Sequence, residues 1–565
     1  MFPSVDGRFV ILAVLPASFV FIKAFTRLIQ NRQNKPCLRP GPVPLPLLGN
    51  VLSIDTKEPW LTYTEWAAAH GDLVFVRLLG QEVVVINSQH VAEALMDKRS
   101  RIYSDRPYLA TVEPFGWSDI FAFTGYGDEW RLARRLFHQS FRPESALKFR
   151  PMQIKKAREM VINLIDDSQH YHSHFATFSS SIAMSVTYGY QTSPRDDPLV
   201  RIAESALVIG LQVMTPEKAI LLKIFPFLLR LPDWCWGSAI KRDAQVSTHR
   251  MTEMTDLPFQ YAQEHMAEDL SLGQVSMVSD NLQRMEKLDQ SSKPIFETAL
   301  KKAAATAIVG SYETTTSTLM TFSLAMVLYP DIQKRAQAEI DSVVGADRLP
   351  TFEDRASLPY VESVLRETWR WHPVGVLGVP HATSNDDTYD GYFIPKGLLF
   401  SSSEQIFCDI VHQERPSYLT YGAFHGMKSG TPDASSFIPE RFLDVNNALT
   451  DDDPAEYVFG FGRRACPGRH AADASVWSAI VTMLATVEFS SAKDDQGKVI
   501  EFTPQFTTGL TQYLVFLVSF HFLGTNSSIV LAALWSSLAI SQHALVPIQN
   551  LWMFSEREYD MCSGE

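Results

Sequence analysis

Positions 459–468 of this 565-residue chain read FGFGRRACPG, and this stretch decides the fold. One cysteine, Cys466, follows two arginines and lies among glycines, which let the backbone pass close to a flat partner. Directly after it, residues 469–487 carry apolar side chains at helical spacing. The stretch therefore predicts a loop that presents one cysteine at the start of a long helix.

The position of Cys466 suggests its chemistry. At a helix start the dipole and the free N–H groups favour a thiolate. A thiolate beside a flat partner and arginines indicates haem iron bound by sulfur, with guanidinium groups on the haem propionates. Two alternatives stay open: a buried cysteine that only packs, and a zinc site on Cys466 and His470, for which the sequence offers no second ligand pair.

The stretch matches, position for position, the FxxGxRxCxG signature of the cytochrome P450 haem-thiolate monooxygenases, and the chain resembles that family. The resemblance implies that the cofactor is haem b and that Cys466 is the axial iron ligand. It places Phe459 beside the cysteine and Arg464 on a propionate. It also implies that the signature glycines, Gly462 and Gly468, lie at the cofactor.

Two further motifs follow the order of the family. ETWR at 367–370 resembles its ExxR helix, and FIPERF at 437–442 resembles its PERF element. The resemblance implies that Glu367, Arg370 and Arg441 form a buried triad that fixes the cysteine loop. Such a cluster is stable only when its charges satisfy one another, since removing one partner costs ~3–5 kcal/mol. Taken alone, Glu-x-x-Arg is a common exposed helix pair.

WRLAR at 130–134 resembles the WxxxR helix of the family, which puts an indole N–H and a guanidinium one turn apart. The resemblance assigns Trp130 and Arg134 to the haem propionates. His381 stands where family members often have an arginine or histidine for the same purpose. A histidine that merely ends a strand after Pro380 is the alternative.

GSYETT at 310–315 resembles the oxygen-activation motif of the family. Splitting dioxygen consumes protons, so an acid and an alcohol side by side make chemical sense, and we assign Glu313 and Thr314 to a proton relay. Ser311 replaces a family glycine that lets the helix open, and its hydroxyl is expected to bond a loosened carbonyl instead. The alternative is a threonine-rich helix face that is simply buried.

The predicted fold is mainly α (α+β): one large helical domain of the cytochrome P450 type with a small β-rich part. Residues 72–86 read as two strands around a turn at Gly80. The longest helix is predicted over 294–328, about 50 Å at the helical rise per residue. The expected organisation is a membrane anchor (1–35), a proline-rich hinge (36–50), the monooxygenase domain (51–511) and an atypical uncharged apolar tail (512–565).

The anchor rests on the uncharged run at 9–22, which is short beside the ~20 residues of a full membrane span. A signal peptide is the competing interpretation, but the basic residues mostly follow the run. Their position predicts a catalytic domain on the cytosolic side of the endoplasmic reticulum membrane. The net charge of −13 argues against a nucleic-acid partner.

Two segments depart from the family. Residues 412–430 replace its usual polar tract, and residues 502–555 contain no Asp, Glu, Lys or Arg, so the expected short basic final strand is absent. Both segments are either real elaborations or products of a translated intron or misjoined reading frame. In the second case the protein would be a non-catalytic relic.

The predicted activity is insertion of one oxygen atom from O2 into a lipophilic small molecule, as in secondary-metabolite or xenobiotic oxidation. By analogy, segments 103–123, 308–313, 374–379 and 506–510 face the substrate, and their apolar character predicts recognition by shape. The chain has no dinucleotide fingerprint, so electrons are expected from a separate NADPH-dependent flavoprotein reductase. The alternative is a reductase-independent haem-thiolate isomerase, dehydratase or peroxygenase, against which the relay pair argues.

Overall fold

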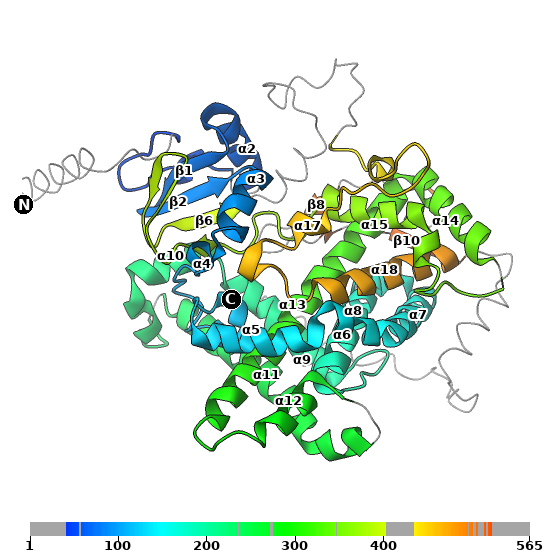
Figure 1. The fold of residues 1–565 in the computed structure, drawn as a ribbon, viewed down its shortest axis with the longest axis horizontal. Coiled ribbons are helices and arrows are strands. Elements are labelled where there is room, and N and C mark those ends of the chain that lie inside the picture. Colours follow the sequence, from blue (N-terminus) through cyan, green and yellow to red (C-terminus); the bar gives the residue numbers. More distant parts are fainter. Residues whose placement is uncertain are drawn as a thin grey trace, which may run out of the picture.

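The computed structural model combines a large helical body with a smaller β-rich part that lies beside it (Figure 1). The described residues are 41–55, 58–235, 237–271, 275–345, 347–402, 434–494, 496–500, 504–506, 514–515 and 518–522. The helices are α2 (Pro59–His70), α3 (Gln89–Ala92), α4 (Ser100–Tyr103), α5 (Asp128–Phe141), α6 (Pro143–Ala146), α7 (Arg150–Asp166), α8 (Tyr171–Tyr188), α9 (Pro198–Val213), α10 (Pro216–Ile224), α11 (Ala239–Ser271), α12 (Met277–Met285), α13 (Lys293–Leu328), α14 (Pro330–Val344), α15 (Pro359–Trp371), α17 (Ala455–Val458) and α18 (Arg469–Thr486).

Helix α13 runs through the middle of the helical body (Figure 1). Pro294 lies in its first turn, where the missing N–H is not needed. Its apolar and small residues are buried against α5, α8, α15 and α18. The prediction of one long helix over 294–328 is therefore confirmed.

The β-rich part is a four-stranded sheet in the order β1-β2-β6-β3. The strands β1 (Leu73–Leu78) and β2 (Gln81–Ile86) form the predicted antiparallel hairpin, and β6 (Leu399–Ser402) and β3 (His381–Ala382) complete the sheet. Strand β6 runs parallel to β2, from which it is separated by most of the helical body. The predicted mainly α fold with a small β-rich part is thus confirmed.

Three small antiparallel pairs accompany this sheet: β4 (Asp387–Tyr389) with β5 (Tyr392–Ile394), β7 (Val487–Ser491) with β10 (Val518–Phe522), and β8 (Gln505–Phe506) with β9 (Leu514–Val515). Strands β9 and β10 lie inside the segment predicted as an atypical tail. Two strands therefore follow residue 511, and the VSFHF sequence of β10 alternates apolar and polar residues as a strand does, but neither strand contains the Lys or Arg of the expected basic final strand.

The described part of the predicted hinge, residues 41–50, lies on the edge of β1. Asn50 forms two hydrogen bonds with Arg77 of β1: its N–H donates to Arg77 O (2.6 Å), and its side-chain oxygen accepts from Arg77 N (2.9 Å). Its side-chain amide also donates to Pro42 O within the hinge (3.1 Å). At Gly49 φ is +69°, and a Cβ there would meet Arg77 O at 1.9 Å. The segment is fixed to the sheet at a position that only glycine fits.

The predicted anchor (1–35), the 412–430 segment and residues 523–565 of the tail lie outside the described residues. Among the residues that are described, no helix combines the length and the apolar character needed to cross a bilayer.

Candidate active site

The cysteine loop is closed by its own backbone. Cys466 N donates to Phe459 O at 2.7 Å, and α18 begins three residues later, at Arg469. Phe459 packs edge-on against Trp369 of α15, with ring centroids 5.4 Å apart. The predicted loop before a helix is therefore present, with the helix ending one residue earlier than expected because Val487 begins β7.

The two signature glycines serve different contacts. At Gly462 φ is +58°, and a Cβ would meet Met96 O at 2.0 Å, so glycine is required there by another backbone segment, the π-helical turn Glu93–Asp97. A Cβ on Gly468 would lie 4.0 Å from Cys466 Sγ. The structure thus brings Gly468, more directly than Gly462, to the side of the sulfur.

Burial raises the pKa of the Cys466 thiol. The N–H groups of Gly468 and Arg469 and the positive charges of Arg134 and Arg469 act in the opposite direction. The predicted stabilisation of a thiolate by the helix start is present, but burial outweighs it. A coordinated metal ion removes the proton from such a thiol and reverses this balance.

The structure brings the predicted propionate residues Trp130, Arg134, His381 and Arg464 to one place beside the cysteine loop. The Arg464 guanidinium lies 4.2 Å from the centroid of the Trp130 ring. Its Nε donates to Ser104 O and its Nη2 to Thr124 O, each at 2.8 Å. Arg134 Nη2 donates to Ala465 O at 2.6 Å, which ties α5 directly to the residue before the cysteine.

Arg106 belongs to the same place, and the sequence motifs did not reveal it. Its Nε donates to Ala122 O, and its Nη1 donates to Val379 O and Pro380 O. Its charge also acts on His381, whose Nδ1 donates to Tyr103 O at 2.7 Å. The available signal was a charged residue inside the apolar segment 103–123.

The three arginines Arg106, Arg134 and Arg464, together with the neighbouring His381, are called the cationic cluster below. Burial lowers the pKa of Arg134 and Arg464 to about 10 and that of His381 to about 3, and it lowers the pKa of Arg106 well below its ordinary value. Within the described chain, none of the three arginines forms an ion pair. The negative charge of Asp105 opposes the shift for Arg106 and Arg464 without removing it.

Arg464 also retains an unused donor. Its Nη1 is buried and has no hydrogen-bond partner among the described residues. Buried donors are normally satisfied, because leaving one unpaired costs ~1–3 kcal/mol. A half-buried set of cations that form no ion pairs within the described chain, with a free N–H group, fits the anionic carboxylates of a haem.

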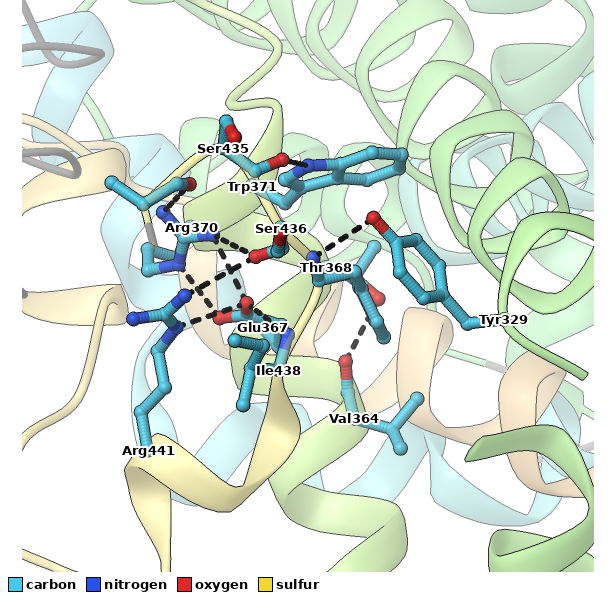
Figure 2. Close-up of polar contacts among 12 residues, drawn as sticks. Tyr329, Val364, Glu367, Thr368, Arg370, Trp371, Ser435, Ser436, Ile438 and Arg441 are labelled. Carbon is cyan, nitrogen blue, oxygen red and sulfur yellow. Dashed lines mark hydrogen bonds and ion pairs between the residues drawn. The ribbon is translucent and has the colours of Figure 1, made fainter. Parts of the chain in front are cut away.

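A second charged group lies behind the loop and is fully paired (Figure 2). Glu367 accepts from Arg370 Nε at 2.7 Å and Nη2 at 3.0 Å, and from Arg441 Nε at 3.2 Å. Ile438 N donates to the same carboxylate at 2.6 Å. Glu367 and Arg370 are 0% exposed, so the structure brings the predicted triad together and uses it to join α15 to residues 434–441.

Helix α13 presents two different faces at the predicted relay. A Cβ on Gly310 would meet no atom within 4 Å, and this glycine is exposed although it lies in the central helix. Thr314 Oγ1 donates to Gly310 O at 2.6 Å, and Glu313 is half-buried. Thr315, Thr316 and Thr318 are buried, so the alternative of a merely buried threonine face describes those residues and not Thr314.

Ser311 does not behave as expected. Helix α13 is continuous through this position, and the Ser311 hydroxyl donates to Ser179 O of α8 at 3.1 Å instead of bonding a carbonyl of its own helix. The reason is the close approach of α8, which offers a polar partner on that side. A further alternative, zinc, gains no support: in the part of the chain that the structure describes, no three His, Cys, Asp or Glu side chains converge on a metal position.

Two of the segments predicted to face the substrate are tied to helices of the body. Phe121 N donates to Thr306 Oγ1 at 2.9 Å, which holds segment 103–123 on α13. Phe506 stacks on His372 at 4.2 Å, which ties β8 to the end of α15. Residues 507–510 lie outside the described residues.

A cysteine presented by a glycine-rich loop, a half-buried cationic cluster beside it and an exposed glycine on the central helix together define a haem-thiolate site. These residues fit a haem: the cations suit its propionates, the free Arg464 donor can bond one of them, and the cysteine sulfur suits its iron.

Comparison with known proteins leads to the same class. The family model described as Cytochrome P450 matches residues 39–403 and 429–516. The chain is 33% identical over 479 residues to cytochrome P450 monooxygenase claR of Ampulloclitocybe clavipes, covering 84% of each chain. It is 34% identical over 469 residues to cytochrome P450 monooxygenase COX2 of Coprinopsis cinerea, covering 82% of this chain and 84% of the relative.

The chain therefore belongs to the cytochrome P450 family and is a haem-thiolate monooxygenase. Members of this class use O2 and a redox partner and bind lipophilic substrates. The family match omits residues 404–428 and ends at 516. These limits overlap the two segments that depart from the family in sequence.

Proposed function

We propose that this protein uses haem b to insert one oxygen atom from O2 into a lipophilic small molecule of the secondary-metabolite or xenobiotic type, with electrons from NADPH through a separate flavoprotein reductase. The observation that carries this proposal is the uncompensated cationic cluster beside the Cys466 loop. When bound, the haem supplies an iron that binds and activates dioxygen.

Each residue of the site has one task in this proposal. Cys466 ligates the iron, and Phe459, Gly462 and Gly468 shape the loop that presents it. Trp130, Arg134 and Arg464, joined by Arg106, would hold the propionates by charge-assisted hydrogen bonds. His381 would join them in its protonated form, which a nearby carboxylate favours. Glu367, Arg370 and Arg441 keep the loop in position without contacting the cofactor.

Proton supply falls to Glu313 and Thr314. The Thr314 hydroxyl donates to Gly310 O, so its oxygen keeps lone pairs that can accept a proton on the open side of α13. Glu313, half-buried at the neighbouring position, is the acid that supplies a new proton to Thr314 after the hydroxyl has given one up. We assign the pair to delivery of protons for O–O scission.

An exposed apolar surface supports association with the endoplasmic reticulum membrane. Its members are large hydrophobic side chains on α10 and the following turn (Leu221, Ile224, Phe225, Phe227, Trp234) and near the start of the described chain (Val43, Leu45, Leu47, Leu48, Leu52). Lys223 Nζ donates to Gln81 Oε1 at 3.1 Å, which joins α10 to β2, and Figure 1 shows α10 beside the sheet. Exposed apolar groups in this number favour a lipid or protein partner over water.

A basic surface beside the cysteine loop supports docking of an acidic reductase. The exposed guanidinium groups of Arg131 and Arg463 both lie over the Tyr126 ring, 5.4 and 5.7 Å from its centroid. Arg135 and Arg469 are exposed nearby on α5 and at the start of α18. Complementary charge guides such encounters and makes them sensitive to salt.

The experiment is the absorption spectrum of the reduced, carbon-monoxide-bound full-length protein. We expect the red-shifted Soret band of a thiolate-ligated haem, and we expect Cys466→Ala to abolish it. Absence of the band from the wild-type protein would overturn the proposal and favour a non-catalytic relic. Turnover with hydrogen peroxide alone, with none from NADPH and reductase, would favour the reductase-independent alternative.

A further inference from the structure

Ser179 of α8 and Ser311 of α13 form a reciprocal pair. Ser179 Oγ donates to Ser311 O at 2.6 Å, and Ser311 Oγ donates to Ser179 O at 3.1 Å. The two hydroxyl oxygens are also 3.1 Å apart. Ser179 is 2% exposed, so these bonds are shielded from water.

The pair lies directly behind the relay. Ser311 follows Gly310, whose carbonyl accepts from the Thr314 hydroxyl on the open side of the helix. The Ser311 carbonyl, by contrast, is bound on the α8 side, where Thr315 is also buried. Two adjacent peptide groups of α13 are therefore held from opposite sides, one by Thr314 and one by Ser179.

Such a pair fixes the register of two helices. Apolar side chains can slide past one another at small cost, whereas a shift of α13 along α8 would leave two buried hydroxyls and two carbonyls without these partners. The serine that stands at the motif position of a family glycine is thus matched by a serine on the facing helix.

We propose that Ser179 is a positioning residue for the proton relay: by binding the Ser311 carbonyl it holds the Gly310–Thr314 turn at a fixed position along α8. This inference deepens the proposed function and rests on it. Ser179 contacts neither substrate nor cofactor in this scheme, and acts only through the backbone of α13.

The test compares Ser179→Ala with Ser181→Ala. Ser181 lies on the same helix, is equally buried at 2% exposure, and donates to Phe178 O of its own helix at 2.8 Å. Both variants lose one buried hydroxyl, but only the first loses a contact with α13. Ser179→Thr restores the hydroxyl and serves as the conservative rescue.

The first measurement is amide hydrogen exchange of the peptide spanning 308–316, followed by mass spectrometry on the full chain. We expect Ser179→Ala to speed exchange there about fivefold to tenfold, the factor that corresponds to one lost hydrogen bond. Ser181→Ala and Ser179→Thr should stay within about twofold of wild type. Equal exchange in Ser179→Ala and wild type would overturn the proposal.

The second measurement is hydrogen peroxide released per NADPH oxidised, with purified reductase and an alkoxycoumarin as probe substrate. We expect about threefold to tenfold more peroxide per NADPH in Ser179→Ala, because a misplaced relay delivers protons less reliably. An unchanged ratio contradicts the positioning role. Failure of the wild-type protein to give the thiolate Soret band would instead refute the proposed function, and the exchange result would still decide the register of α13.

The reciprocal bond gives one more check. Ser311→Ala removes one donor but leaves the Ser179 hydroxyl bound to the carbonyl of residue 311, so we expect a smaller change in exchange than in Ser179→Ala. In the double variant Ser179→Ala/Ser311→Ala, the change in the free energy of exchange should be smaller than the sum of the two single changes, because the residues act as one unit. Strict additivity would contradict this account of the pair.

Discussion

Two charged groups of the site, the Glu367 triad and the cationic cluster, are built in opposite ways. In the Glu367 triad, one carboxylate accepts from both Arg370 and Arg441 and from a backbone N–H. In the cationic cluster, the described chain offers no ion pair to Arg106, Arg134 or Arg464, and one donor of Arg464 is unused.

The difference separates a structural joint from a binding site. A buried charge is costly unless it is paired. The triad contains its own counter-charge and is complete within the polypeptide. The cationic cluster accumulates positive charge whose cost is offset when an anion arrives, which is what a carboxylate-bearing cofactor supplies.

The largest loss of stability is expected from breaking the Glu367 triad. Glu367→Ala leaves two buried guanidinium groups without a carboxylate and should lower the free energy of unfolding by ~3–5 kcal/mol. The measurement is denaturant unfolding at neutral pH. Glu362→Ala is the matched control, because Arg355 keeps its bond to Asp473 at 2.6 Å when Glu362 is lost. Equal destabilisation by the two changes would show that Arg370 and Arg441 do not depend on Glu367 for their counter-charge.

An intermediate loss of stability is expected at acidic pH, through protonation of His381. The pKa of His381 is about 3, below its ordinary value of 6.5, because of burial and then the charges of Arg106 and Arg464. Between these values the unfolded chain binds a proton that the folded protein does not, so stability is fully present above about pH 6.5 and falls as pH drops.

His381→Asn removes this titrating group. The wild-type protein should lose about 2 kcal/mol more than the variant between pH 7 and pH 5, as linkage requires for such a shift. Unfolding curves at the two pH values measure it. His372, whose pKa is also lowered to about 3, remains in both proteins. The control is His90→Asn, at an exposed position of α3. The same loss in His381→Asn and wild type would show that His381 is not held neutral.

The smallest effect on the polypeptide is expected from Arg464→Leu. Removing a desolvated cation relieves repulsion within the cluster, so the unfolding free energy of the haem-free chain should fall far less than in Glu367→Ala. Haem affinity should fall about tenfold, the cost of one charge-assisted hydrogen bond. Titration of haem into the wild-type protein and the Arg464→Leu variant measures this affinity, and Arg463→Leu, at an exposed position, is the control. Unchanged haem affinity would remove Arg464 from the site.

Much of the site could be predicted from local sequence. FGFGRRACPG, ETWR, FIPERF and WRLAR each place their functional residues within a few positions of one another, so short-range geometry and the resemblance were enough. Arg106 was not predicted because no local pattern marks it. It becomes part of the site only when segment 103–123 packs against residues 379–381.

Two further features depend on a distant partner. The helix start favours the Cys466 thiolate as expected, and burial by the surrounding elements raises the pKa of the thiol in opposition to it. The Ser311 hydroxyl was expected to bond its own helix, but α8 supplies the acceptor. Both outcomes depend on what lies across an interface, which periodicity and spacing do not reveal.

The sequence by itself determined the class of protein, the long central helix, the β1–β2 hairpin and the cysteine at a helix start, because these follow from residue types at close spacing. Only the tertiary structure decided which charges are paired and which remain free, and which face of α13 is open. Pairing and burial are properties of groups brought together from far along the chain, and their energies exist only once the fold has closed around them.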